Sequence, residues 1–254
     1  CAHLSGTLPP EVGTIATLML LGLSVNPLSG SIPPESGNLR RLDNLNLRDN
    51  GLSGSIPPEI GKLAWGLADK FVVGYSGNMG RAHEFETILK AAERLRGRSD
   101  IVFLWIGGGA WREWLEQEAA QRGIHSFLFR PYQPREKLGE SLAVPDIHLI
   151  SLRPELEGLI VPSKFYGIAA AGKPAIFIGD QAGEIAKILK DNACGYVAAV
   201  GEEDVLAGYI EKLAGDPEMC RGMGQRARQE FEEKYDKPIA MRAWEEVLEK
   251  DISE

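Results

Sequence analysis

The sequence predicts an α/β protein: a parallel sheet with helices on both faces, preceded by a truncated repeat solenoid. Residues 64–254 alternate short apolar runs with helical patterns, an alternation typical of parallel sheets. Residues 1–63 instead repeat one motif at an interval of 24 residues. We therefore expect two domains, residues 1–63 and residues 64–254.

The first domain is built from copies of one motif. "LSGTLPPEVGTI" begins at Leu4, "LSGSIPPESGNL" at Leu28 and "LSGSIPPEIGKL" at Leu52. Between them, "LMLLGLSVN" and "LDNLNLRDN" share the spacing L-x-x-L-x-L-x-x-N and end at Asn26 and Asn50. That spacing places alternate leucines on one face of a short strand. The asparagine follows in the turn, where its amide can satisfy backbone groups.

Each unit also carries a glycine and a proline pair. Gly6, Gly30 and Gly54 permit a tight bend, and we expect each Pro-Pro pair to hold an extended segment. Residues 4–63 resemble plant-type extracellular leucine-rich repeats, which generally recognise proteins or form an architectural stack. The exposed strand face would carry side chains that are not distinctive: Met19, Leu20, Asp43 and Asn44.

The repeat does not continue beyond Leu63. The next strand register falls on Gly66, Asp69, Phe71 and Gly74 in place of three leucines and an asparagine. We therefore expect no third strand of that kind and an open last half-turn.

The second domain should contain six strands. The expected strands are "FVVGYSG" (71–77), "IVFLWIGGG" (101–109), "SFLF" (126–129), "DIHLI" (146–150), "PAIFIG" (174–179) and "GYVAAV" (195–200). Helical patterns cover 85–95 and 111–119, and further helical stretches begin near Arg135, Lys164, Ala182 and Glu203. Right-handed crossovers make this a Rossmann-like layer, with its ligand at the carboxyl ends of the strands.

The loop after the first strand is rich in glycine. Gly77, Asn78 and Gly80 lead into a helix, a geometry that lets backbone N–H groups approach a phosphate. The glycine spacing is G-x-x-G-x-x-G, however, and not the dinucleotide fingerprint. The second strand ends in a glycine run at Gly108, where a nicotinamide dinucleotide site needs an acidic residue. Dinucleotide binding is therefore the weaker alternative.

The segment "ELEGLIVPSKFYGIAAAGKPAIFIGD" (155–180) gives the sharpest indication. Here the chain resembles the nucleotide-sugar-binding C-terminal domain of GT-B glycosyltransferases of family 4, over residues 64–254. Glu157 and Gly158 match the opening of that family's E-G-x-x-x-P loop. "GKPAIFIGDQAGEIAKIL" and "MGQRARQEFEEKY" are similar to its closing segments.

The resemblance implies half of a GT-B fold, a retaining transfer reaction and a UDP-sugar or related donor. Glu157 would hold sugar hydroxyls, and the departing diphosphate would be stabilised by the cations Arg81 and Lys164 with no metal. These three are the candidate catalytic residues. The candidate nucleotide-sugar contacts are Gly77, Asn78, Gly80, His83, Gly108, Arg130, Tyr132, Gly158, Leu159, Ile160, Ser163 and Glu184. Among them, Arg130 and Tyr132 would face the base, and the backbone of Leu159 and Ile160 would touch the diphosphate.

The chain departs from the family pattern at two places. The second glutamate of the loop, which would hold the ribose, is replaced by Phe165 or Gly167, depending on the alignment, and Glu184 is the candidate substitute. The usual arginine and lysine of the first loop fall on Asn78 and His83. Phosphate contact would then pass to Arg81 and His83.

Composition excludes two function classes. A net charge of −8 without a basic run argues against nucleic acid as a partner. No apolar run reaches the roughly 20 residues of a membrane-spanning helix.

The cysteines and histidines indicate neither disulfides nor a metal site. The three cysteines are scattered and form no disulfide framework, and the histidines show no metal-ligand spacing. A cytoplasmic location is expected.

The acceptor-binding half of a GT-B enzyme has no counterpart in residues 1–63. The expectation is a donor domain that is incomplete as an enzyme and whose acceptor is unknown. A protein partner could bind through the repeat or through an exposed face of the closing helix, which carries Ile239, Trp244, Val247 and Leu248. The alternatives are a non-enzymatic repeat scaffold that binds proteins and a chimera whose parts have no joint function.

Overall fold

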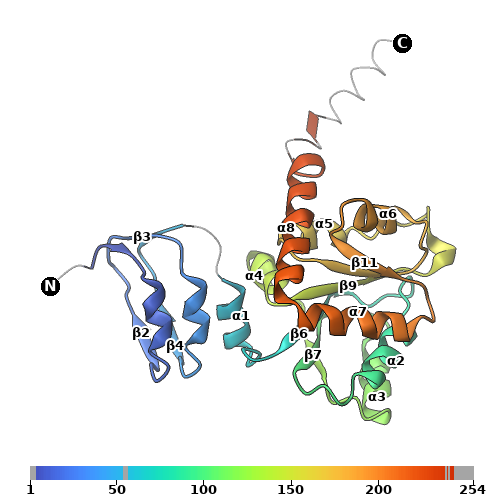
Figure 1. Cartoon of the computed structure of the whole chain (residues 1–254), viewed down its shortest axis with the longest axis horizontal. Coiled ribbons are helices and arrows are strands. Elements are labelled where there is room, and N and C mark those ends of the chain that lie inside the picture. The colour runs from blue at the N-terminus through green and yellow to red at the C-terminus, as the bar shows by residue number, and fades with distance from the viewer. Residues whose placement is uncertain (1–3, 54–56, 238, 240, 243–254) are drawn as a thin grey trace. The chain divides into compact units, whose positions relative to one another are not determined.

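The computed structural model describes residues 4–53, 57–237, 239 and 241–242. Backbone contacts divide the chain into two compact units (Figure 1). Unit 1 comprises Cys1–Lys70 with Glu136–Val144, and unit 2 comprises Phe71–Arg135 with Pro145–Glu254. Each unit is described by itself, and the expected boundary between residues 63 and 64 stays a prediction.

Unit 1 contains short parallel strands that alternate with helical turns. The strands are β1 (Gly6–Thr7), β2 (Leu20–Gly22), β3 (Leu28–Gly30), β4 (Asn44–Asn46) and β5 (Gly51–Leu52). The helical turns are η1 (Pro10–Thr14), η2 (Pro34–Asn38) and α1 (Pro58–Ala64). One sheet has the order β1-β3-β5, and β2 pairs with β4 in another, so Leu20 lies opposite Asn44, one repeat further on. Among the described residues, no third strand joins β2 and β4.

The repeated asparagines satisfy backbone groups as the spacing predicts. Asn50 Nδ2 donates to the carbonyl oxygens of Leu23, Leu47 and Arg48 at 2.9, 2.9 and 3.1 Å. Its Oδ1 accepts from the Leu28 N–H at 3.3 Å. The amide therefore links two successive units, and Asn26 makes the equivalent bond to the Leu4 N–H at 2.9 Å.

The glycine bends are confirmed, but the proline prediction is half wrong. Gly6 and Gly30 have φ of 99° and 76°, in the region that favours glycine. Gly54 lies outside the described residues. Pro9 and Pro33 are extended, whereas Pro10 and Pro34 begin the helical turns η1 and η2. A fixed φ and a missing N–H suit the first helical position, and this explains the difference.

Glycines also set the spacing between the helical turns. A Cβ on Gly13 would lie 2.0 Å from the Glu35 carbonyl oxygen, and one on Gly37 would lie 2.1 Å from Glu59 Cβ. At the third equivalent position, a Cβ on Gly61 would lie 2.9 Å from Val144 Cγ2. α1 contacts α4 (Leu138–Ala143) of the same unit. The segment ending at Val144 therefore packs against α1, next to Gly61.

Unit 2 is built on a parallel sheet of six strands, which confirms all six predicted strands. They are β6 (Phe71–Asn78), β7 (Ile101–Gly108), β8 (Phe127–Arg130), β9 (Ile147–Ser151), β10 (Ala175–Ile178) and β11 (Gly195–Ala198). Their order in the sheet is β11-β10-β9-β6-β7-β8. The chain thus builds outward from β6 in one direction and then from β9 in the other.

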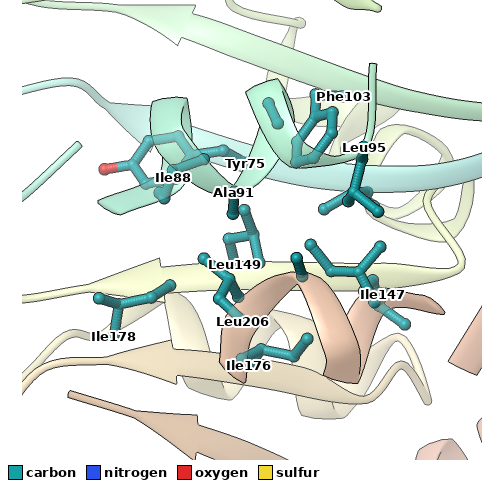
Figure 2. Packing of buried hydrophobic residues seen from close by; sticks show 14 of the residues in the cluster. Tyr75, Ile88, Ala91, Leu95, Phe103, Ile147, Leu149, Ile176, Ile178 and Leu206 are labelled. Carbon is teal, nitrogen blue, oxygen red and sulfur yellow. The ribbon is translucent and has the colours of Figure 1, made fainter. Parts of the chain in front are cut away.

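Helices cover both faces of this sheet. They are α2 (Glu86–Arg94), α3 (Arg112–Gln121), α5 (Lys164–Ala170), α6 (Glu184–Asp191), α7 (Glu203–Gly215) and α8 (Pro217–Lys234). A 3-10 turn, η4 (Pro154–Leu156), follows β9, and a second, η3 (Arg135–Lys137), contains residues of both units. Along β10, Ile176 and Ile178 pack with α2 and α7, whereas Phe177 packs with α5 and α6 on the other face. Figure 2 shows the first of these two cores, with Ile88 and Leu206 reaching the strand side chains from the helices.

The chain closes with α8 and the residues beyond it. Asp216 caps α8 by accepting from the Met219 N–H at 2.9 Å. Of the four apolar residues predicted for an exposed closing face, only Ile239 is described. Trp244, Val247 and Leu248 lie outside the described residues. Within the described chain, no helix combines the length and apolar character needed to span a bilayer.

Candidate functional site

The strand order reverses between β6 and β9, and candidate residues gather there. β6 pairs with β9 through Val73 and Gly74, opposite Ile147 and His148. From this pair the chain continues to β7 and β8 on one side and to β10 and β11 on the other. Loops diverge at such a switch point and leave a crevice at the carboxyl ends of the strands.

Lys164 is the first residue of α5 and reaches this point. Its Nζ lies 3.8 Å from the centroid of the Tyr75 ring on β6, a cation–π contact. The ammonium is shielded from solvent, and no hydrogen-bond partner for it exists in the described part of the chain. Burial lowers the pKa of Lys164 to about 7. The protein thus holds a titratable cation without a counter-charge at the switch point.

Two serine hydroxyls near the ends of the same two strands are also buried without partners. Ser76 lies near the end of β6, and Ser151 is the last residue of β9. Neither Oγ atom contacts a hydrogen-bond partner among the described residues. Buried polar groups are normally satisfied, so unsatisfied groups concentrated on two adjacent strands mark a place where a polar ligand can bind.

His83 lies beside this cluster in the loop between β6 and α2. Its Nδ1 is 2.5 Å from the Ser151 carbonyl oxygen, which can only accept, so Nδ1 carries the hydrogen. Burial, together with the nearby charge of Lys164, lowers the pKa of His83 to about 4. The imidazole is therefore neutral at pH 7 and its Nε2 carries a lone pair. Nε2 can therefore accept a hydrogen bond but cannot donate one to a phosphate. The positive charge that balances a bound anion must come from other residues.

The glycines at the ends of β6 and β7 are required by packing. Gly77 and Gly107 have φ of 127° and 135°, and a Cβ on Gly107 would lie 2.1 Å from the Gly77 carbonyl oxygen. A Cβ on Gly109 would lie 2.3 Å from Asn78 Oδ1. At Gly77 itself a Cβ would lie 3.8 Å from Lys164 Nζ, so this glycine borders the buried ammonium. Gly80 lies in the same loop, beside the Asn78 amide.

Glu157 does not contact Lys164 through any recorded hydrogen bond or ion pair. Its Oε1 accepts from the backbone N–H of Glu184, the first residue of α6, at 3.1 Å. A Cβ on Gly183 would lie 2.6 Å from the Glu157 carboxyl carbon. The structure therefore brings together two residues that were predicted separately, Glu157 and Glu184. The carboxylate of Glu157 lies at a helix N-terminus, where negative charge is stabilised.

The predicted base-facing residues follow β8. The Tyr132 hydroxyl lies 3.3 Å from the Gly108 carbonyl oxygen, and the Tyr132 ring would lie 3.3 Å from a Cβ on Gly108. Tyr132 is 59% exposed, so its ring is accessible to a planar ligand. Arg130 is the last residue of β8, and its guanidinium contacts the Phe129 carbonyl oxygen at 3.4 Å.

The remaining candidates lie in exposed loops. Arg81 is exposed. Gly158 has a φ of 79°, and the side chains of Leu159 and Ile160 are 78% and 41% exposed. Ser163 precedes α5, but its side chain makes no capping hydrogen bond. These loop residues follow β6 and β9, and none of them forms a hydrogen bond with Lys164 Nζ.

Tyr75, Ser76 and Ser151 complete the site around Lys164, and none of them is assigned a role from the sequence. Arg153 follows β9, and its Nε lies 3.4 Å from the His83 carbonyl oxygen. The signal available in the sequence was position, because polar residues at the ends of apolar strands point toward a ligand edge. Among the described residues, no group of three or more His, Cys, Asp or Glu side chains could hold a metal ion.

The sequence matches two family models. Residues 64–230 match the family described as "Glycosyl transferases group 1", and residues 41–63 match "Leucine Rich Repeat". The first match covers all six strands of unit 2.

Two curated proteins are similar to part of the chain. The putative colanic acid biosynthesis glycosyl transferase WcaI of Escherichia coli is 31% identical over 120 residues, covering 47% of this chain and 29% of that protein. The probable glycosyltransferase WbjE of Pseudomonas aeruginosa is 28% identical over 144 residues, covering 57% of this chain and 36% of that protein. The chain thus spans about a third of the length of these relatives.

Solved structures share the fold. Anabaena HepE in complex with UDP-glucose superposes with a TM-score of 0.66 at 15% identity, covering 88% of this chain and 63% of that chain. The C-terminal domain of LpcC from Francisella tularensis, a glycosyl transferase group 1 family protein, gives a TM-score of 0.61 at 18% identity, covering 72% of this chain and 95% of that domain. At these identities the likeness concerns the fold.

Proposed function

The chain belongs to the glycosyl transferases group 1 family, and from this premise we propose that unit 2 is the nucleotide-sugar-binding half of a retaining, family-4-like GT-B glycosyltransferase. The donor is a UDP-sugar or a related nucleotide-sugar. HepE, which has the same fold, binds UDP-glucose in its crystal structure, and this supports a uridine nucleotide as the first ligand to test.

The observation that carries this proposal is the unpaired ammonium of Lys164 between two strand ends that also hold unpaired hydroxyls. A diphosphate supplies the missing counter-charge and acceptor atoms for Ser76 and Ser151. The flexible four-carbon stem lets the ammonium leave the Tyr75 ring and follow the ligand. Lys164 is therefore assigned to the diphosphate, and exposed Arg81 is assigned to it as a second cation.

The other candidates are assigned around this point. Tyr132 offers an exposed ring face for the base, and the backbone after Gly158 lies on the diphosphate. Glu157 faces the sugar hydroxyls, and Glu184 replaces the missing ribose carboxylate. His83 stays neutral beside Lys164 and contributes shape and a hydrogen-bond acceptor.

In the transfer step, the bond between sugar C1 and the β-phosphate oxygen breaks, and the electron pair leaves with the diphosphate. A hydroxyl oxygen of the acceptor forms the new bond to C1 on the same face, and its proton passes to the departing diphosphate. Lys164 and Arg81 stabilise the charge that develops on the leaving group, so the reaction as proposed needs no metal.

The acceptor half of the enzyme is a separate part of this proposal. We propose that a second domain, outside residues 64–254, binds most of the acceptor. Residues 4–63 are proposed to be a truncated plant-type leucine-rich-repeat solenoid. The hydrogen bonds that Asn26 and Asn50 make between successive units support this assignment. The exposed residues Met19 and Leu20 would contact a protein partner.

Isothermal titration of the whole chain with UDP, GDP and NAD tests the proposal. UDP is expected to bind saturably, and at 100 times its dissociation constant it should raise the free energy of unfolding by about 2.7 kcal/mol. If none of the three nucleotides binds, the donor-domain assignment is wrong and a repeat scaffold becomes the better account. Binding of NAD alone would favour the dinucleotide alternative.

A further inference from the structure

A pocket of about 210 Å³ lies beside the proposed donor site. Residues 83–86 line it from the loop after β6 and the first residue of α2. Trp111 and Trp114 line it from the start of α3, and Arg153 lines it from the loop after β9. These segments follow three different strands, so the pocket opens at the same carboxyl edge as the switch point. His83 belongs both to this pocket and to the surroundings of Lys164.

The size of the pocket restricts what it can hold. Sites for drug-sized ligands occupy roughly 300–1,000 Å³, and a nucleotide-sugar is of that size. A pocket of about 210 Å³ therefore suits a single ring. It does not suit the donor as a whole.

The lining combines ring faces with a few polar groups. Trp111 and Trp114 pack edge to face with ring centroids 5.3 Å apart, and Phe85 adds a third aromatic ring. The Nε1 atom of Trp111 is buried and has no hydrogen-bond partner in the described chain. A ligand oxygen that reached this N–H would satisfy a donor that is otherwise unpaired.

The charged residues that line the pocket differ in whether their side chains are free to bind a ligand. Both Glu84 oxygens accept from the Thr87 N–H, at 3.1 and 3.3 Å. The Glu86 carboxylate is held by both terminal nitrogens of Arg122, at 3.0 and 2.9 Å. Arg153 is exposed, and it donates to the His83 carbonyl oxygen through Nε. Arg153 can therefore donate to a ligand, while His83 Nε2 can accept from one.

Apolar ring faces beside one or two donors and one acceptor suit a sugar ring, which has C–H groups on its faces and hydroxyls at its rim. We propose that this pocket binds the terminal sugar of the acceptor. The inference rests on the proposed function, because only a transferase needs an acceptor sugar beside the donor diphosphate. It adds a subsite on the donor half itself, with Trp111, Trp114 and Arg153 as its binding residues.

The test uses the whole chain labelled with 5-fluorotryptophan and observed by ¹⁹F NMR. Trp111→Phe and Trp114→Phe assign the two pocket resonances, and the Trp65 resonance in unit 1 serves as the reference. The probes are methyl α-glucoside, methyl α-galactoside, methyl α-mannoside and methyl β-N-acetylglucosaminide. At least one is expected to shift the Trp111 and Trp114 resonances saturably in the millimolar range, without shifting Trp65.

Arg153→Ala serves as the second variant, because this side chain is exposed and its removal leaves no cavity in the core. It should weaken binding of the effective glycoside at least threefold and leave UDP affinity unchanged. Failure of all four glycosides to shift either resonance overturns the inference. So does displacement of the glycoside by uridine, which would make this a base pocket. Loss of UDP binding with retained glycoside binding would instead defeat the donor proposal and leave the sugar pocket standing.

Discussion

The ammonium of Lys164 lies 3.8 Å from the centroid of the Tyr75 ring and is the buried cation at the junction of β6 and β9. A cation–π contact offsets part of the cost of burying the charge, but it does not replace the hydrogen bonds that water would supply. An unpaired ammonium at the ligand-binding edge of the sheet lowers the free energy of unfolding but is available to bind an anionic ligand. Stability and affinity should therefore respond in opposite directions when Lys164 is changed.

Lys164→Met is expected to raise the free energy of unfolding by about 1–3 kcal/mol at pH 7, because an unpaired polar group is removed while the stem is kept. The same change should weaken UDP binding about 10- to 100-fold, because one charge-assisted hydrogen bond is lost. Chemical denaturation and isothermal titration measure the two effects. Lys187→Met, on the exposed face of α6, is the matched control and should change neither quantity. A stabilised variant with unchanged UDP affinity would show that Lys164 is not at the donor site.

The lowered pKa of Lys164, about 7, makes UDP binding depend on pH. In the free protein the amine is largely neutral above pH 7, whereas a bound diphosphate favours the protonated form. UDP binding at pH 8 should therefore take up a proton, and affinity should fall by up to about tenfold per pH unit above pH 7. Titration in buffers of different ionisation enthalpy counts the protons. Lys164→Met corrects for the ionisation of UDP itself, and equal proton uptake by both proteins would contradict the assignment.

The same pKa shift affects stability between pH 7 and 10.5. There the unfolded chain holds a proton on Lys164 that the folded protein has lost, so the free energy of unfolding should rise with pH across this window. Below pH 7 both states are protonated and the contribution is constant and unfavourable. The stabilising effect of Lys164→Met should therefore shrink as the pH rises from 7 toward 10.5.

His83 should make the protein sensitive to acid. Its pKa is lowered to about 4, so the unfolded state binds the proton more tightly and stability should fall as the pH drops from 6.5 to 4. His83→Asn, which can still donate to the Ser151 carbonyl oxygen, should flatten this part of the curve. NMR titration should give a neutral ring with the hydrogen on Nδ1 at pH 7. His125→Asn, on an exposed residue, is the control, and an identical acid profile for the wild type and His83→Asn would contradict this environment.

The close approach of the helical turns in unit 1 can be tested at Gly37. A Cβ there would lie 2.1 Å from Glu59 Cβ and 3.0 Å from the Glu59 carbonyl carbon, so Gly37→Ala must push two turns apart. Overpacking of this kind costs about 1–3 kcal/mol. Gly139→Ala is the control in the same unit, because nothing lies within 4 Å of its Cβ. Hydrogen exchange of the Asn50-bonded amide of Leu28 should quicken in Gly37→Ala alone, and unchanged exchange would mean that the units are not stacked as described.

The sequence predicted the parts of the fold that depend on local pattern. Continuous apolar runs such as 101–106 predicted strands that are buried on both faces. The 24-residue interval identified the asparagines whose side chains form hydrogen bonds between successive units. The proline pairs were only half predicted, because extended and first-helical positions both accept the φ of proline. The position of Val144 beside Gly61 could not be predicted, because it joins residues far apart in the chain.

In the candidate site, too, local features could be predicted from the sequence and contacts between distant residues could not. Lys164 could be identified from its place at the start of a helix after a strand-end loop. Its contact with Tyr75 could not, because Tyr75 reads as one more apolar residue of β6. The bond between Glu157 and the Glu184 N–H also depends on how two separate loops meet. The sequence pattern shows where strands and helices end and which kinds of side chain lie there. Which side chains contact each other across the switch point is seen only in the tertiary structure.

A crystal structure of the whole chain soaked with UDP is the sharpest test of the role assigned to Lys164. The β-phosphate should lie within hydrogen-bonding distance of Lys164 Nζ, with the ammonium moved off the Tyr75 ring and the base against Tyr132. UDP bound elsewhere, or bound while Lys164 still lies unpaired over Tyr75, would contradict this role.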